Sequence, residues 1–251
     1  MKNIAAIFAG GVGSRMGSSV PKQFLEIYGK SIIIHTLEKF QYNPNIDLIY
    51  VGCKEEYIPL LKEQTKKYGI TKIPEDGILP GGESGQDTIY RVLKRIEEHN
   101  EKDDIVLIHD GVRPLIDDGL INECIEATKK YGNAITCARN IETPVYSEDG
   151  ITVDKTPHRD FMYVAKAPQC FHLSDILEAH YIVREKYPNY ENSQIVDSCT
   201  LMRSVGKTVH IVNGNRSNIK VTTTDDYINL LSKMTAEDYM QLLKLTQKGD
   251  F

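Results

Sequence analysis

Two cations beside a glycine-rich turn are the first residues in this sequence whose types and spacing could carry out chemistry. An apolar run of strand length, Ile4–Phe8, ends in Ala9-Gly10-Gly11-Val12-Gly13-Ser14. Arg15 follows this turn directly, and Lys22 comes soon after it. Glycines let a backbone approach a ligand closely, and the N–H groups of such a turn can cradle phosphate oxygens. The stretch therefore predicts a nucleoside-triphosphate site in which a planar Arg15 fork and a Lys22 point charge stabilise the transferred phosphoryl group.

The glycines do not match either of two other phosphate-binding motifs. A P-loop requires a lysine directly after its last glycine, whereas Lys22 follows Pro21. The dinucleotide fingerprint requires a third glycine, and counting from Gly11 that position is Met16. An ordinary strand-to-helix turn remains an alternative for the glycines alone. An NAD(P)-dependent oxidoreductase with a variant Rossmann loop and a nucleotide-binding subunit without turnover also remain open.

An acidic residue stands at the end of another strand-like run, Val106–Ile108, which leads into His109-Asp110-Gly111-Val112-Arg113-Pro114. Ligands of open α/β sheets bind at the carboxyl ends of strands, so Asp110 is expected beside the glycine-rich turn. There it could hold ribose or acceptor hydroxyls, or a Mg²⁺ ion bound to the phosphates. The alternative is that Asp110 caps the next loop. His109 is expected to be structural, because no metal-like partners accompany it.

Strand-like and helix-like runs alternate along most of the chain, which predicts an α/β fold with a doubly wound, mostly parallel sheet. Strands are expected at Ile4–Phe8, Asp47–Val51, Asp104–His109, Asn133–Ala138 and Thr208–Val212. Helices are expected at Ser31–Phe40, Tyr57–Tyr68, within Glu83–His99, at Gly119–Tyr131, at Leu173–Lys186 and from about Thr224.

The alternation fails between residues 141 and 164. Asp149-Gly150 stands between the runs Thr143–Ser147 and Ile151–Asp154, which predicts a hairpin tip. Two interpretations are equally open: an arm that reaches another subunit, or a hairpin that lies on its own sheet. Because no repeat or low-complexity linker interrupts the chain, residues 1–251 are expected to form a single domain with an arm at about 141–164.

Composition narrows the class of protein. The 251 residues carry a net charge of −5, which argues against a general nucleic-acid-binding role. The first apolar run is too short for a signal peptide, and no apolar segment reaches the ~18 residues of a membrane span. The five cysteines are scattered without a C-x-x-C pair, as expected for reduced thiols in a cytoplasmic protein. No membrane or nucleic-acid partner is therefore expected.

The motifs near the start of the chain resemble those of the alditol-phosphate cytidylyltransferases. AGGxGxRMG at 9–17, PKQF at 21–24 and GKSIIIHTL at 29–37 carry the resemblance, which extends from Lys2 to about Asp226. The family comprises methylerythritol-phosphate enzymes of isoprenoid synthesis and ribitol-5-phosphate enzymes of cell-wall and capsule synthesis. The resemblance implies a Rossmann-like nucleotidyltransferase that makes a CDP-alditol and pyrophosphate from CTP and an alditol phosphate. It also implies a divalent cation such as Mg²⁺ and a homodimer.

By this resemblance, Arg15 and Lys22 are the catalytic cations, and two loops bind the nucleotide. The second loop, at 81–88, would recognise the cytosine and its ribose with backbone groups and short polar side chains. Ser84 or Asp87 could equally serve as the N-cap of the following helix. The family usually has an arginine where Gly85 stands. The nucleotide-binding residues implied are Phe8, Ala9, Gly10, Gly11, Gly13, Ser14, Gly81, Gly82, Glu83, Asp87, Thr88 and Asp110.

The same resemblance implies that a fork-shaped cation, a point cation and a hydroxyl hold the acceptor's phosphate; these are Arg159, Lys220 and Thr143. Asp110 and Arg113 complete the implied acceptor site. The GVRP form of the motif at 111–114 favours D-ribitol 5-phosphate as the acceptor, with 2-C-methyl-D-erythritol 4-phosphate as the alternative. Ala167 and Val196 stand where the family has threonine, and they keep a different polyol phosphate open.

Overall fold

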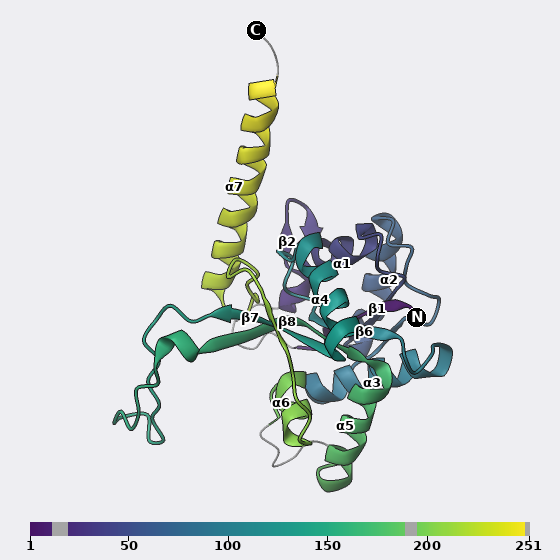
Figure 1. The fold of residues 1–251 in the computed structure, drawn as a ribbon. Helices are drawn as coiled ribbons and strands as arrows, with labels where there is room; N and C mark the ends of the chain where they lie inside the picture. The colour runs from purple at the N-terminus through teal and green to yellow at the C-terminus, as the bar shows by residue number, and fades with distance from the viewer. Residues whose placement is uncertain (12–19, 189–194, 249–251) are drawn as a thin grey trace.

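A mixed sheet lies at the centre of the fold, between two layers of helices (Figure 1). The computed structural model describes residues 1–11, 20–188 and 195–248, with side chains up to residue 236. Within these residues the main sheet has seven strands in the order β5-β4-β1-β6-β8-β7-β9. They are β1 (Asn3–Ala9), β4 (Leu48–Cys53), β5 (Ile78–Pro80), β6 (Ile105–Asp110), β7 (Asn133–Arg139), β8 (Tyr163–His172) and β9 (Ile211–Asn213).

The prediction of a mostly parallel sheet is confirmed, with one exception. β1 pairs in parallel with β4 and β6, as β4 does with β5 and β7 with β9. β8 runs antiparallel between β6 and β7, and the sequence pattern did not predict this strand. Pro168 argues against an internal strand because it cannot donate to the ladder. The sheet accommodates Pro168 at an irregularity, where the pairing of β8 with β7 shifts register between Ile135 and Cys137.

Two layers of helices cover the two faces of the sheet (Figure 1). Alternate residues of β1 belong to the two cores on opposite faces of the sheet. Ala5 and Ile7 pack in the core between the sheet and α1, α2 and α4. Ile4 and Ala6 pack in the core between the sheet and α3, α5 and α6. A strand that is buried on both faces reads as a continuous apolar run for this reason. The helices are α1 (Ile32–Tyr42), α2 (Ile58–Lys67), α3 (Gly85–His99), α4 (Asp118–Tyr131), α5 (Leu173–Lys186) and α6 (Ser198–Ser204).

Short polar residues begin three of these helices. Ser84, Asp117 and Asp197 are the N-caps of α3, α4 and α6. The side-chain oxygen of each accepts the N–H of the third residue on, at 3.1, 2.8 and 2.8 Å. Gly132 ends α4 with φ at +84°, a conformation that L side chains rarely adopt. The caps place α3 and α4 close to their predicted positions, whereas the short helix α6 was not predicted.

A small hairpin supports the C-terminal helix. It consists of β2 (Glu26–Ile27) and β3 (Lys30–Ser31), and the helix is α7 (Thr224–Lys248). Tyr227 Oη donates to the Glu26 carbonyl at 2.6 Å, and Leu230 packs with Ile27 in a separate apolar cluster. Farther along, α7 extends away from the sheet (Figure 1). None of the described helices combines the length and the apolar character needed to cross a membrane.

An arm projects from the sheet between β7 and β8 (Figure 1). The runs on either side of the predicted hairpin tip pair in a single antiparallel bridge, between Tyr146 and Lys155, and form no regular strands. Side chains hold the tip instead: Asp149 accepts the N–H groups of Ile151 and Thr152, each at 2.8 Å. The predicted turn is present, with Gly150 at φ +72°. Because the segment projects from the sheet, the interpretation of a hairpin that lies on its own sheet is wrong (Figure 1).

Candidate active site

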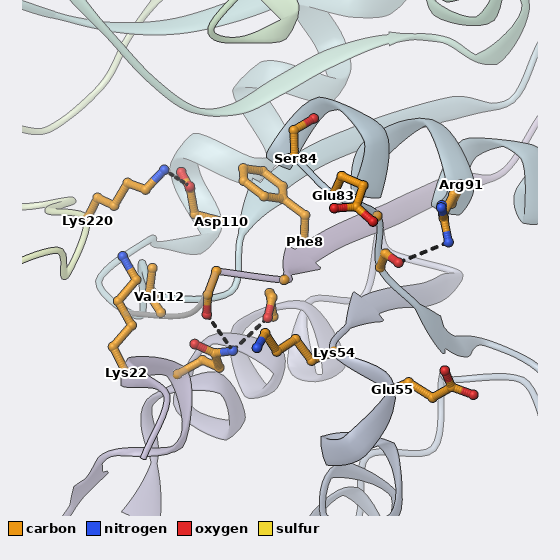
Figure 2. A pocket seen from close by; sticks show the side chains of 17 residues that line it. Phe8, Lys22, Lys54, Glu55, Glu83, Ser84, Arg91, Asp110, Val112 and Lys220 are labelled. Atoms are coloured by element: carbon orange, nitrogen blue, oxygen red, sulfur yellow. Dashed lines mark hydrogen bonds and ion pairs between the residues drawn. The ribbon is translucent and has the colours of Figure 1, made fainter. Parts of the chain in front are cut away.

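A pocket of about 690 Å³ opens where the carboxyl ends of β1, β4 and β6 meet (Figure 2). Parallel strands of an open sheet deliver their terminal residues to one such edge, as the sequence predicted for the turn and for Asp110. The lining residues are Phe8, Ala9, Gly10, Gly11, Lys22, Gln23, Lys54, Glu55, Gly81, Gly82, Glu83, Ser84, Gly85, Arg91, Asp110, Val112 and Lys220.

The start of the glycine-rich turn is fixed from behind by a buried amide. Gln23 Nε2 donates to the Ala9 carbonyl at 2.7 Å and to the Gly11 carbonyl at 3.3 Å. Lys22 is its neighbour in the chain, and a Cβ built on Gly11 would lie 3.9 Å from Lys22 Cε. The predicted catalytic lysine therefore lies against the turn and lines the pocket. Gly13, Ser14 and Arg15 lie outside the described residues, so their roles stay predictions.

The second predicted loop closes the pocket from the side of α3. Gly82 allows this loop to fold tightly, because a Cβ there would lie only 1.7 Å from Asp87 Oδ2. Thr88 Oγ1 accepts the Gly82 N–H at 3.0 Å and donates to the Ser84 carbonyl at 3.0 Å. Asp87 and Thr88 thus hold the loop from beneath. Gly81, Gly82 and Glu83 line the pocket. Asp87 and Thr88, which were also predicted to bind the nucleotide, do not line it.

Asp87 is bound by two arginines from different helices. Its carboxylate pairs with Arg91 Nε at 3.0 Å and with Arg184 of α5, and it also accepts the Glu83 N–H at 3.3 Å. Burial would raise the pKa of Asp87, but Arg184 and Arg91 outweigh it and lower the pKa below its ordinary value. Arg91 also donates to the Gly81 carbonyl at 3.1 Å and reaches the pocket (Figure 2).

Asp110 forms the centre of a buried charge cluster at the end of β6. Its Oδ2 accepts from Arg113 Nε at 2.7 Å, and its Oδ1 pairs with Lys220. Burial would raise the pKa of this carboxyl, but the Arg113 and Lys220 cations lower it below its ordinary value. Arg113 also donates to the Asn218 carbonyl at 3.0 Å. The cluster therefore presents Asp110 ionised and Lys220 facing the pocket (Figure 2).

His109 is structural, as the sequence predicted. Its side chain is fully buried, and Nε2 lies 3.1 Å from the Arg113 carbonyl. Burial lowers the pKa of His109 to about 4, so the ring is neutral near pH 7. His109 lines neither this pocket nor the second, smaller pocket described next, so it has no direct role in the chemistry of the site.

A second pocket of about 280 Å³ adjoins the first. The two share a wall made of Phe8, Gly85, Asp110 and Lys220. The second pocket is also lined by Gln86, Ile89, Ile108, Arg113, Ala165, Lys166, Ala167, Gln169, Val196, Asp197 and Ser198. Lys166 donates to the Asn218 carbonyl at 3.1 Å. Burial lowers the pKa of Lys166, and the nearby Arg113 and Arg216 lower it further.

The structure does not bring Thr143 and Arg159 to either pocket of this chain. Both lie in the projecting arm, and the Arg159 side chain is 60% exposed, with Asp160 Oδ1 at 3.9 Å from its Nε. The other implied acceptor residues, Asp110 and Lys220, line both pockets, and Arg113 lines the second. The implied acceptor site is therefore divided between the sheet edge and the arm.

Sequence reasoning missed several lining residues, and one of them had a usable signal. Lys54 directly follows β4, the parallel neighbour of β1, so the rule that placed Asp110 would also have found Lys54. Figure 2 shows its side chain pointing into the pocket. Arg91 and Lys166 lie inside α3 and β8, where a cation ordinarily indicates a solvated face, so no comparable signal marks them.

The described residues offer no ready metal cage. They contain no cluster of three or more His, Cys, Asp or Glu side chains suited to a metal ion. The Asp110 carboxylate, the predicted candidate, is already engaged by Arg113 and Lys220. Its fit as a Mg²⁺ ligand is therefore poor.

The fold, the glycine-rich turn and the charged pocket define a nucleotidyltransferase of the α/β class. A family model described as IspD, 2-C-methyl-D-erythritol 4-phosphate cytidylyltransferase, matches residues 4–238, and the chain belongs to this family of cytidylyltransferases. The resemblance found in the sequence is thereby confirmed. Membership in an enzyme family decides against the oxidoreductase and non-catalytic alternatives.

Curated relatives carry two different names. A ribitol-5-phosphate cytidylyltransferase of Vibrio parahaemolyticus is 44% identical over 241 residues, which cover 96% of this chain and 99% of that protein. A 2-C-methyl-D-erythritol 4-phosphate cytidylyltransferase of Clostridium botulinum is 37% identical over 238 residues, covering 93% and 99%. Among solved structures, the 4-diphosphocytidyl-2C-methyl-D-erythritol synthase of Anaerococcus prevotii matches with a TM-score of 0.78 and 27% identity, over 93% of this chain and 96% of that one.

Proposed function

We propose that this cytidylyltransferase joins CTP and D-ribitol 5-phosphate to form CDP-ribitol and pyrophosphate, in a homodimer in the cytoplasm, for cell-wall or capsule synthesis. The observation that carries the proposal is the pair of adjoining pockets, which share Asp110 and Lys220 on a common wall. CTP would occupy the larger pocket and the alditol phosphate the smaller one. The choice of ribitol rests on the relatives of that name, at 39–44% identity.

The reaction needs positioning and charge neutralisation more than proton transfer. A phosphate oxygen of the acceptor attacks the α-phosphorus of CTP, and the bond to the bridging oxygen breaks as pyrophosphate leaves in line. The attacking phosphate is already an anion at pH 7, so no general base is required. Arg15 and Lys22 would neutralise the charge that develops on the triphosphate. Lys220, oriented by Asp110, would hold the acceptor's phosphate at the common wall.

Mg²⁺ is part of the proposal as a partner of the triphosphate. Since Asp110 is engaged by two cations, oxygens of the triphosphate together with water would hold the ion. When bound, the ion supplies additional neutralisation of phosphate charge.

A second copy of the chain would complete the acceptor site. The arm carries Arg159 and Thr143, and it exposes large apolar side chains, with Ile151 88% and Phe161 81% accessible. Exposed apolar clusters of this kind mark interaction surfaces. The arm of one protomer would therefore bring its arginine and threonine to the acceptor phosphate bound by the other protomer.

2-C-methyl-D-erythritol 4-phosphate is the second candidate acceptor, because the matching family model and the relatives at 36–37% identity carry its name. Pyrophosphate release measured with CTP and a panel of acceptors separates the two. The panel contains ribitol 5-phosphate, methylerythritol phosphate, glycerol 3-phosphate and several sugar phosphates. We expect the highest kcat/KM with ribitol 5-phosphate. A higher value with methylerythritol phosphate would overturn the choice of acceptor, and no turnover with any of them would overturn the proposed reaction.

A further inference from the structure

Lys54 follows the end of β4 at the level where the two neighbouring strands continue into glycines. In the register of the sheet, the last residue of β4 lies opposite the last residues of β1 and β5. The residues that come next are Lys54 after β4, Gly10 after β1 and Gly81 after β5. Adjacent strands lie about 4.8 Å apart, so the two glycines flank the backbone of Lys54. All three residues line the larger pocket, and of the three only Lys54 carries a side chain.

The glycines on either side are imposed by α3. A Cβ built on Gly10 would lie 2.9 Å from Thr88 Oγ1, and one built on Gly81 would lie 3.0 Å from the same atom. A side chain at either position would crowd α3, so bare backbone remains beside Lys54. Glycine backbone lets a ligand approach closely. The surface at the two glycines can therefore take a flat ring, with Lys54 at its border.

The Lys54 side chain points into the larger pocket (Figure 2). It is 37% exposed, and the ion pair that the described residues give it is long: Glu56 Oε1 lies 3.7 Å from Lys54 Nζ, with the Glu56 side chain 65% exposed. Exposed pairs of this kind contribute little to stability. An ammonium group has three N–H donors. Lys54 therefore has donors to offer to a ligand in the pocket.

The order of the strands orients CTP in the larger pocket. Asp110 ends β6, on one side of β1, and Lys54 follows β4, on the other side. The α-phosphorus must lie on the Asp110 side, because the wall shared with the smaller pocket is there. Lys22 and Lys220, the cations proposed to hold phosphate, lie on that side as well (Figure 2). The nucleoside is then left with the side of Lys54 and of the loop at 81–88.

We propose that Lys54 binds the pyrimidine ring of CTP and selects cytosine over uracil; the inference rests on the proposed function. The Lys54 ammonium donates to O2 and N3 of cytosine, both of which are acceptors. Uracil carries an N–H at position 3, and an ammonium group can only donate. With uracil, a donor of the ring would face a donor of the protein, which leaves a polar group without a partner. Lys54 thereby adds a side-chain contact to the backbone groups of the loop at 81–88.

Lys54→Met removes the charge and keeps the length and the apolar stem of the side chain. In the full chain, with pyrophosphate release as the assay, the variant should raise KM for CTP by about 10-fold and leave KM for the alditol phosphate unchanged. With UTP in place of CTP, the variant and the wild-type enzyme should have equal kcat/KM. The preference for CTP over UTP should therefore fall by about 10-fold. An equal loss with both nucleotides would overturn the selection of cytosine.

Calorimetry with CMP and UMP separates the ring from the phosphates and needs no acceptor. Lys54→Met should bind CMP about 10-fold more weakly than the wild-type protein does, and UMP equally well. Pyrophosphate, which has no ring, should inhibit both enzymes alike. Weaker inhibition by pyrophosphate with unchanged binding of CMP would place Lys54 on the triphosphate and overturn the inference. If the wild-type protein binds CMP but turns over no alditol phosphate, the proposed function falls, and calorimetry still decides the role of Lys54.

Two variants serve as controls. Lys207→Met removes a lysine of similar exposure, 42%, whose Nζ pairs with Glu178 at 3.0 Å and which lines neither pocket. Glu56→Gln removes the charge that pairs with Lys54 and keeps Lys54 itself. Both controls should bind CMP as the wild-type protein does. If Glu56→Gln weakens CMP binding as much as Lys54→Met does, the ion pair acts by shaping the loop, and the inference is overturned.

Discussion

Asp87 of α3 and Arg184 of α5 form an ion pair across 97 positions of the chain, directly beneath the loop at 81–88 that closes the larger pocket. Arg184 also lies over the ring of Tyr90, 3.8 Å from its centroid, so its guanidinium is held from two directions. Asp87 accepts the Glu83 N–H and pairs with Arg91, so Arg184 of α5 supports the loop at 81–88 through Asp87.

Arg184→Ala should therefore raise the KM for CTP by about 10-fold, because the loop loses its support while its own residues stay intact. Both side chains of the pair are at most 17% exposed. The free energy of unfolding should accordingly fall by about 2–4 kcal/mol, since Asp87 loses a partner. Steady-state kinetics and urea denaturation measure the two effects. Arg95→Ala is the control: its ion pair with Asp76 at 3.0 Å is exposed and contributes less than about 1 kcal/mol. An unchanged KM for CTP in Arg184→Ala would contradict the role given to the pair.

The two cations of the first turn should act on the transition state more than on the binding of CTP. Lys22→Ala and Arg15→Ala are each expected to lower kcat by about 10²-fold or more while the protein stays folded. Pyrophosphate release gives kcat, and circular dichroism reports the fold. Lys129→Ala, which removes an exposed lysine paired with Glu126 on α4, should leave kcat unchanged. Near-normal turnover in either turn variant would rule out its assignment.

Exchange of the arm between protomers predicts complementation. Lys22→Ala removes a cation at the sheet edge, and Arg159→Ala removes one from the arm. In a mixed dimer, one of the two composite sites would contain neither change, so mixing the two inactive variants should restore part of the activity. Size-exclusion chromatography with light scattering measures the oligomeric state alongside. A fully active monomer, or a mixture that stays as inactive as its components, would refute the exchange.

His109 should make folding stability depend on pH in a defined window. Its pKa is lowered to about 4 in the folded protein, from an ordinary value of 6.5. Between these values the unfolded chain binds the proton and the native state does not, so the free energy of unfolding falls as pH falls from 6.5 toward 4. One such group contributes at most about 1.4 kcal/mol per pH unit.

Urea denaturation at several pH values measures this dependence. His109→Gln removes the titrating ring and keeps an amide that can reach the Arg113 carbonyl. Its free energy of unfolding should change less with pH than that of the wild-type protein over the same window. Equal slopes for the two proteins would show that His109 titrates normally in the native state.

Local signals were sufficient to predict one edge of the site. The apolar run of β1 followed by glycines, and the run of β6 followed by Asp110, each identify a buried strand and the point where it ends. Because parallel strands end at the same edge, two separate segments could be placed together without further information. Ser84 as N-cap and Gly150 as turn residue are likewise decided within a few residues of the chain.

Pairings between distant segments left no such signal. The partner of Asp87 lies on α5, and nothing in the helical pattern of that segment distinguishes Arg184 from a surface residue. β8 was missed because Pro168 contradicts the pattern of an internal strand, and only the irregular pairing with β7 makes room for it.

The wall shared by the two pockets has a consequence for inhibition. Phe8, Gly85, Asp110 and Lys220 border both pockets, so a CDP-alditol would occupy the two at once, as a tethered pair of ligands. Tethering makes the second contact intramolecular and raises its effective concentration to the millimolar range. A nucleotide joined by a non-hydrolysable bridge to a hydroxylated chain should therefore bind far more tightly than either half alone.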